Sequence, residues 1–326
     1  MSVNPTPSRR RLLIVVPVVL VVLLSVGVLA RSRLTRLTKG AVAGLTHSGS
    51  AAAIDPSYFA SGACMSYPPS NGDRHITVFL DAGHGGLDPG GVGETESGQQ
   101  IDESHVNLPI ELDAMAMLRA QGFRVVVSRT TNTTVLKLGH GDTDGQLLSL
   151  QGSHDDVVAR DVCANLAHAE LLVGIYMDAG GSPANAGSVT TYDTDRPFSA
   201  ANLTFATLLQ NDVLSAMNAE GWDIPDDGVV SDATEGSSVG DPATGGLATE
   251  AANYDHLMLL GPASPGYFST PSQMPGAVIE PLYVTDPFEG SIAVSTRGQE
   301  VVAKGIARAV EQYFPPTPTT TTTSAG

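Results

Sequence analysis

The sequence has few basic residues outside its first forty positions. Of the 17 Lys and Arg residues, seven lie between Met1 and Gly40, where no acidic residue occurs. The rest of the 326-residue chain therefore carries 10 basic and 34 acidic side chains, a net charge of −24. Affinity for nucleic acid depends mostly on Lys and Arg that neutralise phosphates. The composition excludes nucleic acid as a partner.

Cysteine is also scarce, with only Cys64 and Cys163 in the whole chain. Outside the cytoplasm two such cysteines often pair, and closing a loop of about 100 residues is worth a few kcal/mol. Two unrelated buried thiols are the alternative. The sequence does not give the Cα separation that would decide between them.

Long apolar runs are absent except for one, from Leu12 to Ala30, which spans nineteen positions without a charge. About 20 apolar residues cross a bilayer as a helix, whereas the core of a signal peptide has about 7–15. We expect an uncleaved membrane helix, with a cleaved signal and a buried helix as alternatives. Basic residues flank both ends of the run, so they do not settle its orientation.

Composition divides the chain into four parts. Residues 1–33 are expected to be the membrane anchor or signal segment, and residues 34–75 a linker rich in small residues and proline. Residues 76–314 form the one expected folded domain. Residues 315–326 are a Pro/Thr-rich tail that cannot bury enough apolar area to become ordered.

Apolar runs alternate with helical patterns across the domain. The expected strands are 76–80, 123–129, 171–178, 188–192, 256–261 and 276–284, and the expected helices are 104–121, 157–170, 200–218 and 291–313. Pro109 fits the first helix only if it lies in the first turn. Alternation of this kind predicts an α/β domain with a largely parallel, twisted sheet of about six strands and helices on both faces.

Polar residues follow the ends of several expected strands. His84 comes after the first, Tyr176 and Asp178 end the third, and Glu280 comes within the last. Glu103, at the start of a helix, can reach the same edge. Because sites in such sheets lie beyond the carboxyl ends of the strands, these side chains are expected to converge.

Four segments carry a resemblance to a known family. They are "VFLDAGHGGLDPGGVG" (78–93), "ESHVNL" (103–108), "RDVCAN" (160–165) and "PGAVIEPLYVTDPFE" (275–289). In this order they resemble the zinc-dependent N-acetylmuramoyl-L-alanine amidases, which cut the bond between muramic acid and the stem peptide of peptidoglycan. The resemblance extends from about residue 76 to residue 314.

The resemblance implies roles for individual residues. His84 and Glu103 stand at the first two ligand positions for one Zn²⁺ ion, and Glu280 stands at the catalytic glutamate that activates water. The third ligand of the family, a histidine, is replaced here by Tyr176, and a nearby asparagine of the family by Asp178. Tyrosine is a poor substitute, because its phenol has a pKa of about 10 and must ionise to bind zinc well.

Three outcomes of this replacement stay open. Zinc binds with Tyr176 as a phenolate or with Asp178 as the substitute, two positions along the same strand and on the same face. Alternatively, His105, His140 or His154 completes the site. In the third case the metal is weak or absent, and the protein binds peptidoglycan or regulates a cell-wall hydrolase without cutting.

The expected function is metal-assisted hydrolysis of the muramoyl–L-alanine amide, with peptidoglycan or muropeptides as the substrate. A catalytically degenerate, peptidoglycan-binding or regulatory protein is the alternative. We expect a monomer outside the cytoplasm, anchored to the cytoplasmic membrane through residues 12–30 or secreted to the cell wall. No repeat or separate wall-binding module is visible in the sequence.

Overall fold

The computed structural model describes residues 50–235 and 253–316. The predicted membrane segment, residues 12–30, and the last ten residues of the tail lie outside the described residues. Among the helices in the described ranges, none is both long and apolar enough to cross a bilayer.

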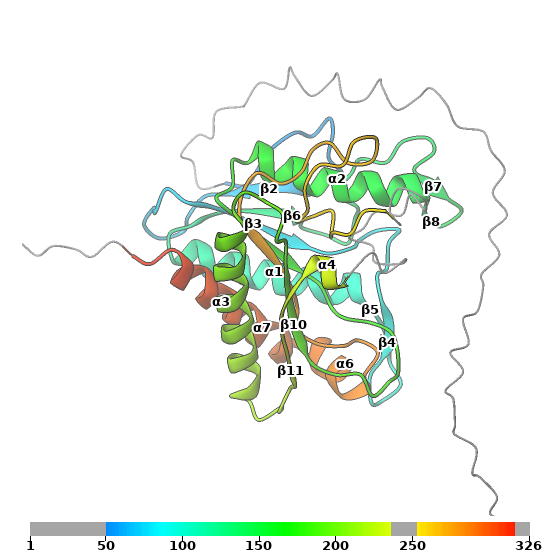
Figure 1. Ribbon diagram of the computed structural model, residues 1–326, viewed down its shortest axis with the longest axis vertical. Helices are drawn as coiled ribbons and strands as arrows, with labels where there is room; N and C mark the ends of the chain where they lie inside the picture. The colour runs from blue at the N-terminus through cyan, green and yellow to red at the C-terminus, as the bar shows by residue number, and fades with distance from the viewer. Residues whose placement is uncertain (1–49, 236–252, 317–326) are drawn as a thin grey trace, which may run out of the picture. The chain divides into compact units, whose positions relative to one another are not determined.

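Eight strands form one central sheet (Figure 1). In chain order they are β1 (Ala52–Ala53), β2 (Ala63–Tyr67), β3 (Thr77–Ala82), β6 (Arg124–Arg129), β9 (Leu171–Ile175), β10 (Ser188–Tyr192), β11 (Asp226–Ser231) and β12 (Gly276–Glu280). Across the sheet the order is β1-β2-β6-β3-β9-β12-β10-β11. Two small hairpins lie outside it: β4 (Val92–Glu94) with β5 (Gln100–Asp102), and β7 (Thr143–Asp144) with β8 (Leu147–Leu148).

The four middle strands of the sheet are parallel, and the strand that adjoins them on each side is antiparallel. β6, β3, β9 and β12 are parallel neighbours, and their apolar runs suit strands that are covered on both faces. β2 is antiparallel to β6, and β10 to β12, whereas β10 and β11 are parallel to each other. The α/β class with one central sheet is confirmed, and the expectation of a largely parallel sheet holds for its middle.

The number of strands differs from the six expected. β2 lies in the segment predicted as a linker, but it pairs with β6, so the folded unit begins before residue 76. β11 was missed because "DDGVVS" is polar, which an edge strand tolerates. The predicted strand 256–261 is wrong, because this segment forms turns. Its apolar residues, among them Met258 and Leu259, are buried without being in a strand.

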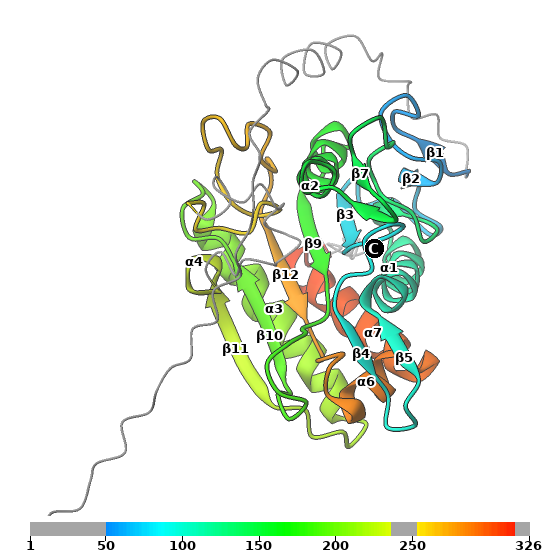
Figure 2. The same cartoon turned by 90° about the vertical axis from the view of Figure 1, so that its right-hand side faces the viewer.

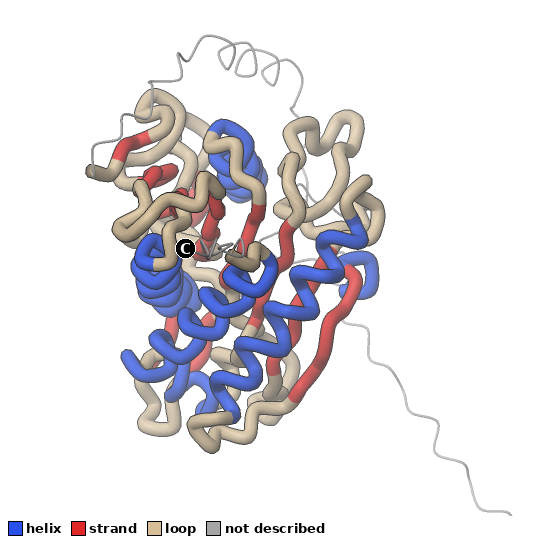
Figure 3. The backbone as a smooth tube through the Cα atoms, turned by 90° about the vertical axis from the view of Figure 1, so that its left-hand side faces the viewer, coloured by secondary structure: helices blue, strands red, loops and turns tan. Residues whose placement is uncertain are grey.

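Helices cover both faces of the sheet, as expected. The long ones are α1 (Glu103–Ala120), α2 (Leu150–Leu166), α3 (Ser199–Asn218) and α7 (Thr296–Tyr313), and the short ones are α4 (Asp232–Glu235) and α6 (Pro287–Ala293). α1, α3 and α7 pack together on one face (Figure 3), and α2 lies on the other (Figure 1).

The main core lies between the sheet and the three packed helices. It includes Val78, Leu80, Val125, Val173 and Ile279 of the strands and Ile110, Leu118, Phe205, Leu209, Ile306 and Val310 of the helices. A smaller cluster on the opposite face joins Val157 of α2 to Tyr254, Met258, Tyr267 and Phe268. The central strands are therefore covered on both faces, and their carboxyl ends are held in fixed positions by this packing.

Two predicted helices differ in detail. Pro109 lies inside α1 and beyond its first turn. The missing N–H of Pro109 affects only the carbonyl of His105, an exposed residue that water can reach. The predicted helix 291–313 is two helices, because Ser295 caps α7 by accepting a hydrogen bond from the Gly298 N–H.

A disulfide joins Cys64 of β2 to Cys163 of α2, with the two Cα atoms 5.7 Å apart. This resolves the alternative between paired and unrelated thiols. The bond connects a strand near one edge of the sheet to the helix that covers one face. Such bonds form and persist in oxidising compartments.

Candidate active site

The carboxyl ends of β3, β9 and β12 lie level with one another. Ile175 of β9 pairs with Ala82 of β3 on one side and with Ile279 of β12 on the other. The residues at positions 84, 176 and 280 therefore lie at one edge of the sheet, where Glu280 is still paired with Val189 of β10. The expected convergence of these strand ends is confirmed by the register.

His84 is 3% exposed and has a left-handed backbone, with φ at 59°. Its Nδ1 lies 2.9 Å from Oδ2 of Asp88, and its Nε2 lies 3.1 Å from Oε2 of Glu103. Burial lowers the pKa of His84, but the two carboxylates outweigh it and raise that pKa to about 10. A non-glycine residue in this conformation is uncommon, and such strain gathers at functional sites.

Glu103 is the first residue of α1 and is also 3% exposed. Its Oε1 accepts hydrogen bonds from Asn107 Nδ2 at 3.0 Å and from the Met177 N–H at 2.9 Å, and its Oε2 accepts one from the Gly91 N–H at 2.8 Å. Burial raises the pKa of Glu103, but His84 and the backbone donors outweigh burial and lower it. The carboxylate is thus held ionised, with Oε2 facing His84.

Tyr176 lies beside His84 with the two rings edge to face, their centroids 5.4 Å apart. Its hydroxyl donates to Oδ2 of Asp81 at 3.1 Å. The other oxygen of Asp81 accepts from Arg160 at 2.6 Å, and Arg160 also donates to Asp156 at 3.0 Å. The phenol oxygen therefore takes part in a buried ion-pair network that connects β3 to α2.

Asp178 and Glu280 occupy the same edge of the sheet. The carboxylate of Asp178 accepts from the Ala179 N–H at 2.6 Å and bonds to the side chain of Tyr283. Burial raises the pKa of Asp178, and these bonds offset part of that effect. Glu280 is half-buried at the last position of β12, where a carboxylate can meet a substrate that approaches the sheet edge.

No third His, Cys, Asp or Glu donor of the described residues joins His84 and Glu103, since the one group of three such donors within 4.8 Å lies elsewhere. His105 and His140 are exposed. His154 is buried and pairs through Nε2 with a backbone carbonyl of the 253–275 segment. None of the three histidines therefore completes the site.

The His84–Glu103 pair fits two of the three protein ligands of a catalytic zinc ion. Zinc bonds of about 2.0–2.2 Å keep two ligand atoms about 3–3.5 Å apart, and these two are 3.1 Å apart. Asp88 holds the other ring nitrogen of His84, as carboxylates commonly do for metal-binding histidines. Tyr176 fits the third position only if its whole side chain moves away from Asp81 towards the pair, because the phenol oxygen is fixed on the ring.

Sequence reasoning gave no role to Asp88 or to Asp81. Asp88 comes four positions after His84 in a glycine-rich loop, and this spacing could have marked it as a partner of the ring. Asp81 is the fifth residue of an apolar strand. A buried carboxylate in such a strand requires a cation, which Arg160 supplies.

A pocket of about 420 Å³ lies next to this edge of the sheet. Its lining comes from the β4–β5 hairpin, the loop 180–183 and the turn at Thr285 and Pro287. These segments adjoin Glu103 and Asp178 in the chain. None of His84, Glu103, Tyr176 and Glu280 lines the pocket itself.

The chain matches the family model described as N-acetylmuramoyl-L-alanine amidase over residues 78–312. It is 24% identical over 243 residues to the N-acetylmuramoyl-L-alanine amidase AmiA of Salmonella typhimurium, covering 73% of this chain and 75% of that protein. It is 24% identical over 250 residues to the amidase AmiC of Neisseria meningitidis serogroup B, covering 75% of this chain and 54% of that protein.

The fold is shared with a solved structure, the CwlD amidase from Clostridioides difficile in complex with the GerS lipoprotein. The TM-score is 0.53 and the sequence identity is 18%, with 73% of this chain and 98% of that chain covered. The chain spans about half the length of the Neisseria relative.

Proposed function

Because this chain belongs to the N-acetylmuramoyl-L-alanine amidase family, we propose that it hydrolyses the amide between N-acetylmuramic acid and L-alanine in peptidoglycan. The observation that carries the proposal is the buried His84–Glu103 pair, at the same sheet edge as Glu280. A histidine and a carboxylate held by fixed neighbours form a pair of zinc ligands, and a second carboxylate is available for proton transfer.

In this proposal His84 and Glu103 hold Zn²⁺, with Tyr176 at the third position. When bound, the ion supplies a Lewis acid for the scissile carbonyl. Glu280 takes a proton from the attacking water and delivers it to the leaving nitrogen, which is ordinary general acid–base work for a carboxylate. Asp88 keeps the imidazole of His84 in the orientation that binding requires.

The pocket between the β4–β5 hairpin and the segments that follow β9 and β12 supports a peptidoglycan substrate. Its volume of about 420 Å³ is in the range of small-ligand sites, and Val92 in its lining is 46% exposed. Polar and small residues, among them Gln100 and Ser182, line the rest. A sugar and the first residues of a stem peptide need such a mixture of apolar contact and hydrogen bonding.

An extracytoplasmic location follows from a cell-wall substrate and agrees with the Cys64–Cys163 disulfide. We further propose that residues 12–30 anchor the chain to the cytoplasmic membrane, or are removed on secretion, and that the protein acts as a monomer. The need for detergent to extract the native protein tests the membrane anchor, and the mass of the intact polypeptide tests whether the segment is removed. The mass of the particle in solution tests the monomer.

A second candidate function is binding of peptidoglycan without hydrolysis. Two observations favour it. The Tyr176 hydroxyl donates to Asp81, and the oxygens of Glu103 already accept three protein hydrogen bonds. A metal would then be bound by two residues alone, which is too few for a tight catalytic site.

The test combines zinc analysis with muropeptide hydrolysis by the purified full chain. We expect about one bound zinc at this site, release of stem peptides, and loss of release in Glu280→Gln with zinc retained. Glu300→Gln, which changes an exposed carboxylate of α7, is the matched control. A metal-free, inactive protein that gains activity from Tyr176→His would establish the second function instead.

A further inference from the structure

Asp193, Asp232 and His256 form a second polar cluster, remote from the edge that holds His84 and Glu280. β10 is antiparallel to β12, and β11 is parallel to β10 (Figure 2). The residues that follow β10 and β11 therefore leave the sheet near the start of β12, at the opposite edge. The cluster is thus separate from the proposed amidase site.

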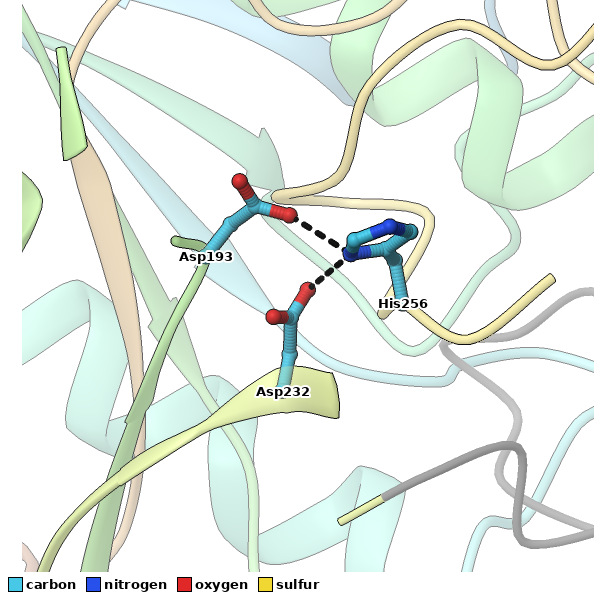
Figure 4. Close-up of side chains that lie close together, drawn as sticks. All are labelled: Asp193, Asp232 and His256. Carbon is cyan, nitrogen blue, oxygen red and sulfur yellow. Dashed lines mark ion pairs between the residues drawn. The ribbon is translucent and has the colours of Figure 1, made fainter. Parts of the chain in front are cut away.

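The three side chains meet at one point (Figure 4). Nδ1 of His256 lies 2.8 Å from Oδ2 of Asp193 and 3.3 Å from Oδ2 of Asp232. The three donor atoms lie within 4.8 Å of one another. The side chains of both aspartates are 0% exposed and that of His256 is 14% exposed.

This arrangement is not a set of ordinary hydrogen bonds. Despite their separation of 2.8 Å, neither Asp193 Oδ2 nor His256 Nδ1 has a hydrogen-bond partner, so their angle is unsuitable for one. The outer oxygens are held by backbone: Oδ1 of Asp193 accepts from the Asp195 N–H, and Oδ1 of Asp232 accepts from the Ala233 N–H. The inner Oδ2 of Asp232 also accepts a hydrogen bond from the Leu257 N–H, at 3.3 Å, while Oδ2 of Asp193 and the ring nitrogen of His256 lie 2.8 Å apart.

Among the described residues the charge at this place is only partly balanced. The positive charge of Arg196 acts on Asp193, but its guanidinium donates its hydrogen bonds to the carbonyls of Leu260, Gly261 and Ser272. Two carboxylates this close are costly to bury in the ionised form without a bound counter-charge, and burial together with Asp193 accordingly raises the pKa of Asp232 to about 8. A protonated His256 supplies one positive charge, whereas a divalent cation supplies two.

The outer nitrogen of His256 also has a carboxylate nearby. Oδ2 of Asp195 lies 3.8 Å from Nε2, and the Asp195 side chain is 65% exposed. A carboxylate beyond the ring is the usual second partner of a metal-binding histidine.

We propose that Asp193, Asp232 and His256 bind one divalent transition-metal cation of the zinc and manganese class. Imidazole favours such metals over magnesium and calcium, and the two carboxylates suit both zinc and manganese. Bonds of about 2.0–2.2 Å to one ion separate its ligand atoms by about 3 Å, as seen here. The ion connects the ends of β10 and β11 to the segment that contains His256.

The test measures bound metal in the full chain after chelator treatment and titration with ZnCl₂ or MnCl₂. We expect the ion of this cluster to be lost, or bound at least tenfold more weakly, in His256→Gln and to be kept in His84→Gln. His140→Gln, at an exposed histidine, is the matched control. Because the ion of the amidase site has the opposite dependence, failure of one proposal is distinguishable from failure of the other.

A spectroscopic measurement covers the case in which His256→Gln does not fold. X-ray absorption of zinc in the folded His84→Gln chain is expected to show one imidazole nitrogen among oxygen ligands. Binding that is unchanged in a folded His256→Gln chain overturns the proposal. So does the absence of any ion from His84→Gln, which would identify the cluster as a proton-bridged ion pair.

Discussion

The hydroxyl of Tyr176 donates a hydrogen bond to Oδ2 of Asp81 at 3.1 Å, while Arg160 binds the other oxygen of the same carboxylate. The residue proposed for the third ligand position therefore satisfies a buried charge of the fold. Gly83 makes room for it, because a Cβ at that position would lie 2.3 Å from the tyrosine ring. Substitution of Tyr176 should consequently affect both stability and metal binding.

Tyr176→Phe is expected to lower the free energy of unfolding by about 1–3 kcal/mol, the usual cost of leaving a buried acceptor without its donor. Denaturant unfolding of the metal-free chain measures this. Tyr192→Phe, at a half-buried tyrosine on β10, is the control and should be nearly neutral. Equal stability of Tyr176→Phe and wild type would mean that the Asp81 contact contributes nothing.

The same variant tests the metal role. If the phenol is the third ligand, Tyr176→Phe weakens zinc binding, and Asp178→Asn leaves it nearly unchanged because Asp178 completes no three-donor group with His84 and Glu103. Isothermal titration with zinc in a His256→Gln background, which removes the second proposed metal site, gives both affinities. A larger loss in Asp178→Asn than in Tyr176→Phe would contradict this assignment and make the aspartate the ligand.

Asp88→Asn removes the carboxylate that faces Nδ1 of His84 at 2.9 Å. Loss of such a second partner commonly weakens metal affinity by about 10–100-fold, and we expect a change of that size in zinc titration. Asp73→Asn is a matched control, because Asp73 pairs with the exposed His75 at 3.5 Å. An unchanged zinc affinity in Asp88→Asn would show that backbone alone orients the His84 ring.

Replacing both Cys64 and Cys163 by serine is expected to lower the free energy of unfolding by about 3–5 kcal/mol. The disulfide closes a separation of 99 residues, and long loops lose the most entropy when they are cross-linked in the unfolded chain. Unfolding curves with and without a thiol reductant measure the effect. The free energy of unfolding of the double-serine chain should be the same with and without reductant. A wild-type chain whose free energy of unfolding is also unchanged by reductant would contradict the expectation.

The strand ends at the site could be anticipated from sequence, whereas the chemistry between them could not. Apolar runs with β-branched residues identified β3, β6 and β9, and the parallel middle of the sheet followed from the alternation. Strand β2 and the edge strand β11 did not, because β2 lies in a segment that resembles a linker and β11 is polar.

Side-chain orientation is the second thing that sequence did not supply. The sequence identified position 176 as part of the site. It did not show that the Tyr176 hydroxyl bonds to Asp81, whose other oxygen is held by Arg160. The Asp193–Asp232–His256 cluster joins three distant segments and has no spacing motif. Its members meet because β10 runs antiparallel to β12 and parallel to β11, so that Asp193 and Asp232 follow neighbouring strand ends.

Glu111 offers a pH-dependent test of the core beneath the site. It is 0% exposed, and its Oε1 accepts hydrogen bonds from the Ala82 N–H at 3.2 Å and from the Ser128 N–H at 2.9 Å. Burial raises the pKa of Glu111 from 4.5 to about 8, although Arg129 and these donors oppose it. Folding therefore favours the protonated carboxyl.

The sign of the effect follows from this direction. A group whose pKa is higher in the folded state contributes stability at pH values below its unfolded pKa, and this contribution is lost as the pH rises from about 4.5 to about 8. Glu111→Gln does not titrate, so the stability of wild type relative to the variant should fall by several kcal/mol between pH 5 and pH 9. Denaturant unfolding at both pH values, with Glu300→Gln as the exposed control, gives the difference. Parallel pH profiles for wild type and Glu111→Gln would mean that the bonds from Ala82 and Ser128 keep the carboxylate ionised despite its burial.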